Sequence, residues 1–150
     1  MATAPPEGEF KHQENPLVQY IVVRKDLLKK PFSWSNGAIV SNSCHASLAV
    51  IAENWSHENV QLYLKNHIRD ADTTILEGGE PNSSLFQMYK VVLAAQNEEE
   101  LLKTQETLNK ENINHHLWVE QPEGIPTALA VMPYRREFIA PFLKSLRLFR

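Results

Sequence analysis

The sequence predicts an α/β fold in which helices cover both faces of a small mixed sheet. Short apolar runs rich in β-branched and aromatic residues alternate with longer segments that carry apolar residues at helical spacing. Their order along the chain is strand, helices, strand, helix, two strands and helix, which is typical of a layered α/β domain. The chain has 150 residues, of which 43% are hydrophobic and 22% charged, as expected of one globular domain with a buried core.

The first strand is predicted at residues 18–23, an apolar β-branched run that is too short for a helix and apolar enough to be buried on both faces. A loop follows as far as Gly37, after which a helix is expected to run to about Trp55. Ser35 or Asn36 can cap this helix, because either side chain can accept a hydrogen bond from a free backbone N–H group of the first turn.

A second amphipathic segment, residues 56–70, carries Val60, Leu64 and Ile68 at helical spacing. Residues 71–84 are rich in Gly, Pro, Ser and Thr and are predicted to form a mobile loop. The remaining elements are expected in this order: a strand at 87–95, a helix at 97–113, strands at 114–120 and 127–133 joined by a turn at 121–126, and a helix at 136–146.

Two of these helices show further local signals. The helix at 97–113 has acidic residues in its first turn, which favour a helix N-terminus, and Leu101, Leu102 and Leu108 are expected to face inward. The last helix contains Pro141, which either breaks it or marks its first turn.

The first turns of the predicted first helix are unusually polar. Positions 38, 42, 45 and 49 fall on one face, so Asn42 and His45 lie side by side with Ala38 one turn before them. This polar face is either a functional site or only a solvated surface. The other faces are expected to be core and carry Ile39, Val40, Cys44, Ala46, Leu48, Val50 and Ile51.

Composition and motifs exclude several classes of function. The single cysteine excludes an internal disulfide and a cysteine-based zinc site, and it fits a reducing compartment, so a cytoplasmic location is expected. Neither a Gly-rich dinucleotide motif nor a Walker motif is present. His115 and His116 are neighbours in a strand and point to opposite faces, so they cannot chelate one metal ion together. We therefore expect no metal and no nucleotide cofactor.

The ends of the chain carry no targeting or membrane signal that the sequence reveals. Residues 1–16 lack a signal-peptide pattern and are expected to be a flexible tail that precedes a domain at 17–150. No segment reaches the roughly 18 apolar residues that a membrane-spanning helix requires, so no membrane partner is expected.

Positive charge is concentrated in two segments, although the whole chain has a formal net charge of −3. One is Arg24–Lys30, which includes Lys25 and Lys29, and the other is Arg135–Arg150. If the two segments meet in space, an anionic partner is expected. If they do not meet, these charges are ordinary solvated surface.

Glu120 ends the third predicted strand, and Thr127 begins the fourth after a short turn. In α/β proteins, ligands bind where strand ends meet a helix N-terminus. We therefore expect a site near the head of the first helix, with Asn42 and His45 opposite the turn.

Four stretches give a more specific indication: VQYIVVRKDL, PFSWSNGAIVSNSCHASLA, HHLWVEQPEGIPTALAVMPY and KSLRLFR. Together they resemble the archaeal and eukaryotic type of peptidyl-tRNA hydrolase over residues 18–150. The resemblance implies a three-layer α/β/α sandwich with a four-stranded mixed sheet. It also implies hydrolysis of the ester that joins a peptide to the ribose of tRNA, without a metal or organic cofactor.

The family motif, of the form G-K-x-A-A-Q-C-S-H-A, is matched only in part. Gly37, His45 and Ala46 agree with it, whereas the motif lysine falls on Ala38 and its glutamine on Asn42. Further along, the family's aspartate falls on Glu120 and its last loop threonine matches Thr127, with a shortened turn between them. The polar face therefore resembles an active-site wall that has lost its lysine.

The resemblance assigns catalytic roles to His45, Asn42, Glu120 and Thr127. Ester hydrolysis needs an activated water and a stabilised oxyanion. His45 or Glu120 can act as the base, and Asn42 with backbone N–H groups of the helix start can bind the oxyanion. Substrate binding is expected from Arg24, Lys25, Lys29 and Lys30.

An alternative to enzymatic activity stays open. The chain can also be a catalytically silent member of the family that binds tRNA or a protein partner, because alanine at position 38 supplies no charge. The sequence leaves the oligomeric state, including a dimer, undecided.

Overall fold

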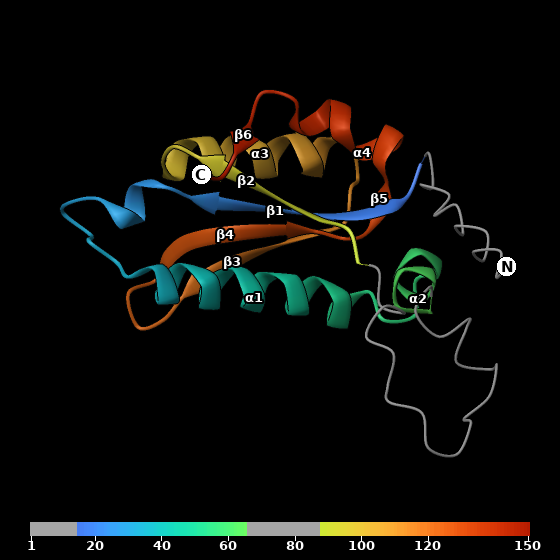
Figure 1. Cartoon of the computed structure of the whole chain (residues 1–150), viewed down its shortest axis with the longest axis horizontal. Coiled ribbons are helices and arrows are strands. Elements are labelled where there is room, and N and C mark those ends of the chain that lie inside the picture. The colour runs from blue at the N-terminus through green and yellow to red at the C-terminus, as the bar shows by residue number, and fades with distance from the viewer. Residues whose placement is uncertain (1–14, 66–87) are drawn as a thin grey trace, which may run out of the picture.

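The structure is a computed structural model that describes residues 15–65 and 88–150. Its elements in chain order are β1 (Leu17–Arg24), the 3-10 turn η1 (Asp26–Leu28), α1 (Asn36–Glu53), α2 (Glu58–Lys65), β2 (Lys90–Ala95), α3 (Glu98–Lys110), β3 (His115–Glu120), β4 (Ile125–Val131), β5 (Tyr134–Arg135), α4 (Arg136–Leu143) and β6 (Arg147–Leu148) (Figure 1). The expected order of strands and helices is therefore confirmed.

The sheet has six strands rather than the expected four. Its order is β3-β4-β1-β2-β6, and β5 pairs with the start of β1. β1 and β2 run parallel, whereas the β1–β4, β3–β4 and β2–β6 pairs are antiparallel, so the sheet is mixed as expected. The two additional strands, β5 and β6, have two residues each, too few to produce a periodic pattern in the sequence.

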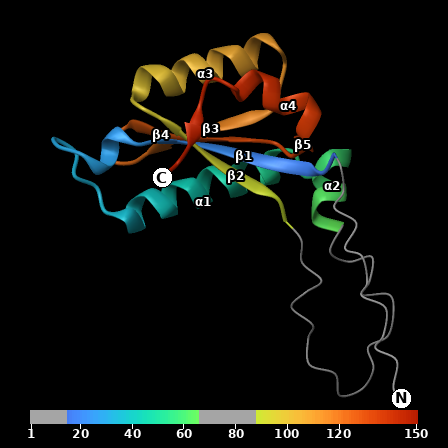
Figure 2. The same ribbon diagram turned by 45° about the horizontal axis from the view of Figure 1, so that its top comes forward.

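Helices cover both faces of the sheet, which confirms the three-layer arrangement. α1 and α2 lie on one face, and α3 and α4 lie on the other (Figures 1 and 2). All eight residues of β1 are buried, and its alternate side chains enter two separate cores. Ile21 and Val23 pack toward α1, whereas Val18 and Val22 pack toward α3 and α4.

α1 begins as the sequence predicts, because the Ser35 hydroxyl accepts a hydrogen bond from the Ala38 N–H at 3.1 Å. Its core-facing line differs from the prediction. Val40 and Leu48 are 61% and 69% exposed, and Cys44 is exposed as well. These three residues share a flank of the helix that points past the sheet, so their expected place in the core is wrong.

α3 also contains one leucine that is more exposed than the sequence predicts. Leu101 and Leu108 are fully buried, but Leu102 is 38% exposed, so its predicted inward orientation is wrong. Neighbouring residues of a helix are about 100° apart, so Leu101 and Leu102 cannot both face one sheet.

Several predictions concern residues outside the described part of the chain. The expected tail lies almost entirely within residues 1–14, and the expected mobile loop at 71–84 and the helical position Ile68 lie within 66–87. These predictions stay untested. Within the described residues, the backbone carbonyl of Pro16 accepts a hydrogen bond from the Arg136 N–H, so ordered contacts begin just before β1.

Candidate active site

Asn42 and Thr127 form the buried centre of the candidate site. The Thr127 hydroxyl donates to Asn42 Oδ1 at 2.8 Å, and Asn42 Nδ2 donates to the Ala38 carbonyl at 2.8 Å. Asn42 is 2% exposed and Thr127 is fully buried. The polar face of α1 is therefore not a solvated surface at Asn42: it is bonded to β4.

A β-bulge directs Thr127 toward α1. In the β3–β4 ladder, Trp118 pairs with Ala128 and Val119 with Pro126, so Thr127 is an extra residue on β4. Strict alternation would place Thr127 on the same side as Leu129, which packs toward α3. The bulge breaks that alternation and turns the threonine hydroxyl to the α1 side.

His45 lies one turn beyond Asn42 and is exposed. Its ring stacks on the indole of Trp118, with centroids 4.6 Å apart and planes inclined by 24°. The Trp118 Nε1 atom is buried and has no hydrogen-bond partner among the described residues. His116, on the same face of β3, directs Nδ1 to a carboxylate oxygen of Glu53 at 2.6 Å. The helix and β3 thus form an aromatic wall with His45 at its outer edge.

Glu120 lies at the end of β3, two residues beyond Trp118 and therefore on the same face of the strand. It is half-buried, and Oε1 accepts a hydrogen bond from the Gln121 N–H at 3.0 Å. The turn after Glu120 closes when Gly124, with φ of +68°, donates its N–H to the Glu120 carbonyl at 2.8 Å.

Of the four predicted catalytic residues, the structure brings Asn42 and Thr127 into direct contact. His45 and Glu120 are connected to that pair through Trp118, whose carbonyl also lies 3.4 Å from the Thr127 hydroxyl. The buried pair can position neighbouring groups but cannot touch a substrate in this conformation. His45 and Glu120 are the members of the set that reach the surface.

Arg24, one of the four residues predicted to bind the substrate, is buried. It is 3% exposed, and its guanidinium donates to Asp26 at 2.8 Å and to the Pro126 carbonyl at 3.0 Å. A third contact, at 3.5 Å, reaches Glu98 at the start of α3. Arg24 therefore joins β1, β4 and α3 and has no surface for a phosphate, because a buried arginine is stable only with its donors paired.

The two basic segments meet at one place only. Lys25, Arg147 and Arg150 line a common cavity of about 560 Å³ at the carboxyl ends of β1 and β2. Lys29 and Lys30 are exposed on the adjoining loop. Arg135 pairs with Leu17 at the opposite end of β1, so the start of the second segment lies far from this cavity.

Comparison with known proteins decides the family. The profile of the family described as Peptidyl-tRNA hydrolase PTH2 matches residues 17–149, which is most of the chain. The chain belongs to the PTH2 family. It is also similar to the mouse and human proteins that are both named "Putative peptidyl-tRNA hydrolase PTRHD1". Each is 41% identical over 134 residues, which cover 89% of this chain and 83% of the relative.

Ala38 is the residue on which the motif lysine falls in the resemblance described above. It is half-buried in the first turn of α1, and its carbonyl oxygen holds the Asn42 amide. Alanine supplies no charge at this position, and the contact with the Asn42 amide is made by the backbone of Ala38, not by its side chain.

Sequence reasoning missed a second polar network in this PTH2 domain, centred on Gln19. This side chain is fully buried, and its Oε1 accepts hydrogen bonds from Lys90 Nζ at 2.6 Å and from the Ser47 hydroxyl at 2.8 Å. Lys90 Nζ also donates to the Tyr63 hydroxyl at 3.1 Å. The signal was a glutamine within the apolar run of the first strand, because a polar residue there must find a partner.

Burial shifts the pKa values of both ionisable residues of this network, Tyr63 and Lys90. Burial raises the pKa of Tyr63 to about 12, because the phenolate is disfavoured away from water. The pKa of Lys90 is lowered by desolvation of its amine, an effect that the electrostatic interaction with Cys44 partly offsets.

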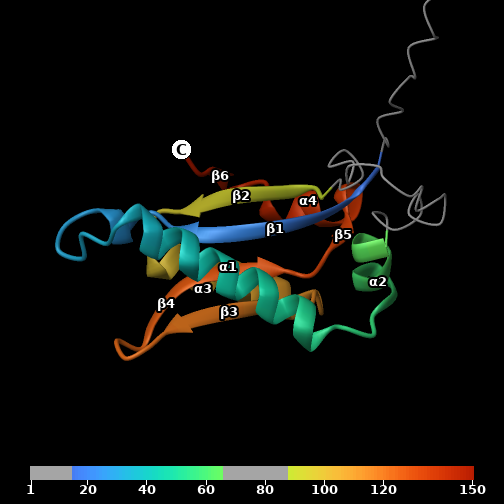
Figure 3. The same ribbon diagram turned by 60° about the horizontal axis from the view of Figure 1, so that its bottom comes forward.

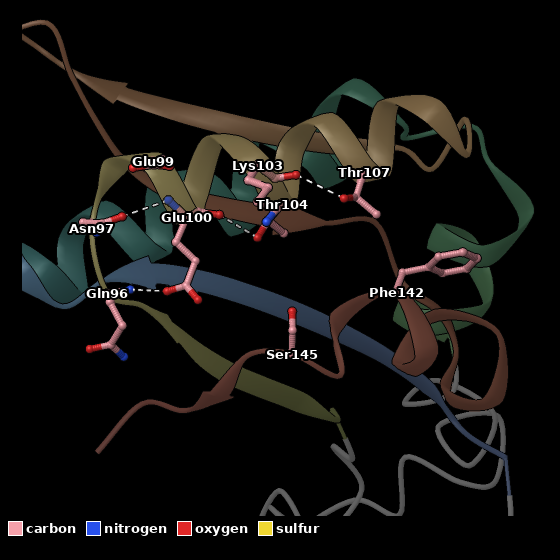
Figure 4. A pocket seen from close by; sticks show the side chains of 9 residues that line it. All are labelled: Gln96, Asn97, Glu99, Glu100, Lys103, Thr104, Thr107, Phe142 and Ser145. Atoms are coloured by element: carbon pink, nitrogen blue, oxygen red, sulfur yellow. Dashed lines mark hydrogen bonds between the residues drawn. The ribbon is translucent and has the colours of Figure 1, made fainter.

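A polar cavity of 420 Å³ between α3 and α4 contains none of the predicted site residues (Figure 4). Its acidic rim is a helix cap: Asn97 Oδ1 accepts from the Glu100 N–H at 2.9 Å, and the Glu100 carboxylate accepts from the Gln96 N–H. These carboxylate and amide groups therefore stabilise the start of α3.

Neither a group of metal ligands nor a helix able to span a membrane is found in the part of the chain that the structure describes. In residues 15–65 and 88–150, no three His, Cys, Asp or Glu side chains are grouped so that they could hold a metal ion. Across the same residues, no helix is both long and apolar enough to cross a membrane.

Proposed function

We propose that this protein hydrolyses the ester bond of peptidyl-tRNA in the cytoplasm, with His45 and Glu120 as the groups that touch the substrate. The observation that carries the proposal is the 2.8 Å hydrogen bond between Thr127 and Asn42, which joins the head of α1 to the bulged start of β4. This bond fixes α1 against β4, which pairs with β3, the strand that carries Trp118 and Glu120. Membership of the PTH2 family supports the reaction class.

The reaction requires attack of water on the ester carbonyl and protonation of the ribose oxygen that leaves. His45 is exposed and held by stacking on Trp118, so its imidazole can accept the proton of the attacking water. Glu120 can orient that water or the imidazolium that forms. Asn42 and Thr127 act as positioning residues, because both are buried and bonded to each other.

The tRNA backbone would lie over the basic end of the sheet. Lys25, Arg147 and Arg150 surround one cavity, and Lys29 and Lys30 extend from the loop beside it. Cationic side chains at such a site contact phosphates without reading sequence. Binding should therefore weaken as salt increases, because each phosphate contact releases a counterion.

The experiment is a turnover assay with peptidyl-tRNA beside a binding assay with uncharged tRNA. We expect turnover by the wild-type protein, loss of turnover with retained tRNA binding in His45→Ala, and weaker binding with unchanged chemistry in Arg147→Gln. Lys110→Gln is the matched control for lost charge, since Lys110 pairs with Glu106 on α3, far from the basic cavity. Wild-type protein that binds tRNA but never releases peptide would refute the enzymatic proposal.

A specific observation favours a second function, that of a catalytically silent tRNA-binding or protein-binding module. The motif lysine is replaced by Ala38, and the Asn42 amide is 2% exposed, so neither position offers a group to an oxyanion. Under this alternative the basic cavity binds tRNA, and the His45→Ala substitution has no effect on any measured property except stability. The same pair of assays separates the two functions.

A further inference from the structure

A second cavity lies on the other side of α1, between this helix and β2. Figure 3 shows α1 in front of the sheet, with β3 and β4 on one side and β1 and β2 on the other. The cavity has a volume of 490 Å³, and most of its lining is apolar. Val40, Leu48 and Val92 border it with exposed fractions of 61%, 69% and 38%. It thus collects some of the most exposed apolar side chains of the described residues at one concave site.

One positive charge lies in this apolar lining. Lys90 Nζ is fixed by hydrogen bonds to Gln19 Oε1 at 2.6 Å and to the Tyr63 hydroxyl at 3.1 Å. An ammonium group has three N–H donors, so one remains for a further acceptor. Of the described residues that line the cavity, none is acidic.

We propose that this cavity binds an aliphatic carboxylate, with the hydrocarbon chain along Val40, Leu48 and Val92 and the carboxylate on Lys90. Burial of a hydrocarbon chain removes apolar surface of both ligand and protein from water, which favours binding. A carboxylate on an ammonium in a largely apolar cavity forms a charge-assisted hydrogen bond, which is stronger than a neutral one. The volume lies within the usual range for small-molecule sites, roughly 300 to 1,000 Å³.

The site is independent of the proposed hydrolysis. His45 stacks on Trp118 toward β3, whereas Val40, Cys44 and Leu48 lie on the opposite flank of the same helix. A ligand in this cavity would therefore leave the candidate active site open.

The only cysteine of the chain, Cys44, lines this cavity and is exposed, so its alkylation by iodoacetamide reports occupancy in the unmodified protein. Three probes with one hydrocarbon chain are compared below their micelle concentrations: dodecanoate, dodecan-1-ol and dodecyltrimethylammonium. We expect dodecanoate to slow alkylation at the lowest concentration, with about tenfold weaker protection by the uncharged alcohol and the weakest by the cation.

Two variants test the two ends of the ligand. Lys90→Met should remove the advantage of dodecanoate over dodecan-1-ol, because the cation that holds the head group is lost, while Gln19 Oε1 keeps the Ser47 hydroxyl as a donor. Leu48→Asp should abolish protection by both, and its fold should persist because Leu48 is 69% exposed. Leu102→Asp, the same change at an exposed leucine of α3, is the matched control and should bind as the wild type does. Protection is expressed as the ratio of rates with and without probe within each variant, since an added charge also alters thiol reactivity.

Any of three results would overturn the proposal. Equal protection by all three probes would show a merely apolar surface, and no protection by dodecanoate would show that the cavity does not take this ligand. Concentration-dependent self-association that protects Cys44 without any probe would instead assign this face to a second copy of the chain.

Discussion

The two flanks of α1 differ in the kind of side chain that each exposes to solvent. On the flank toward β3 and β4, the polar Asn42 is 2% exposed and hydrogen-bonded, and His45 stacks on an indole. On the flank toward β2, the apolar Val40 and Leu48 are more than half exposed. Polar groups are thus buried on one side while apolar groups are open to solvent on the other.

The difference comes from the elements that face each flank. β4 supplies a hydroxyl at the place where the Asn42 amide needs a partner, so burial of that polar group is offset. Beyond β2, the sheet ends in the two-residue strand β6, and α2 has eight described residues, so within residues 15–65 and 88–150 little structure covers the second flank. Exposure along a helix is therefore decided by its neighbours and not by residue type alone.

The largest expected effect tests the catalytic use of the first flank. His45→Ala should lower turnover of peptidyl-tRNA by about a hundredfold, since removal of a general base typically costs that much or more. Stability should fall by only about 1 kcal/mol, the value of one aromatic stacking contact. Turnover per folded molecule and urea unfolding measure the two effects separately. Val40→Ala, at an exposed position on the second flank, should leave turnover unchanged.

The second prediction concerns the bond that holds the first flank to the sheet. Asn42→Ala should lower the free energy of unfolding by about 2 kcal/mol, because the Thr127 hydroxyl loses its acceptor while buried. Thr127→Val should cost a similar amount. The double variant should cost less than the sum, because neither partner is then left unpaired. Strictly additive values in urea unfolding would show that the two residues are not coupled.

The third prediction restores the charge of the PTH2 motif. Ala38→Lys should raise turnover by about tenfold, because a cation one turn before Asn42 stabilises developing negative charge. The unfolding free energy should change by less than about 0.5 kcal/mol, since alanine and lysine are both good helix formers. Ala38→Gln, similar in length and uncharged, is the control. Equal turnover for the lysine and glutamine variants would contradict an electrostatic role.

The fourth prediction uses the polar network beneath the second flank. Unfolded tyrosine titrates near pH 10, whereas burial raises the pKa of Tyr63 to about 12. Between these values the unfolded chain releases a proton that the folded state keeps, so stability falls as the pH increases. The loss should reach about 0.8 kcal/mol by pH 10.5.

Tyr63→Phe isolates this contribution, because it removes the titrating group and keeps the ring. The difference in unfolding free energy between wild type and variant should shrink from pH 9 to pH 10.5. A constant difference across this range would mean that Tyr63 titrates with the same pKa in both states.

The smallest expected effect concerns Leu48, on the exposed flank of α1 that faces β2. Leu48→Ser should change the free energy of unfolding by less than about 0.5 kcal/mol, because Leu48 is already 69% exposed. The measurement is urea unfolding beside Leu101→Ser, at the fully buried leucine of α3, which should cost several kcal/mol. A large cost for Leu48→Ser would show that this flank is covered.

Local sequence signals predict the order of the strands and helices of this protein. A continuous β-branched run predicts a strand buried on both faces, and all eight residues of β1 are buried. Ser35 predicts the start of α1, since a hydroxyl before the first turn satisfies a free N–H group. Such signals depend on neighbouring residues, so the order of elements and the α/β class follow from the sequence.

The motif residues could also be located in advance, but not their surroundings. The positions 38, 42 and 45 share a helix face by periodicity, yet whether that face is solvated or buried depends on what lies across from it. The exposure of Val40, Cys44 and Leu48 was mispredicted for the same reason.

Only the tertiary structure decided that Asn42 and Thr127 meet. They are 85 positions apart, and simple alternation along β4 would turn Thr127 toward α3. One extra residue in the ladder reverses that direction, and the register of two strands carries this information. The burial of Arg24 has the same origin, because its partners are Asp26, Glu98 and Pro126, two of which come from distant segments. A periodic pattern specifies which side chains share a face, whereas pairing register specifies what that face meets.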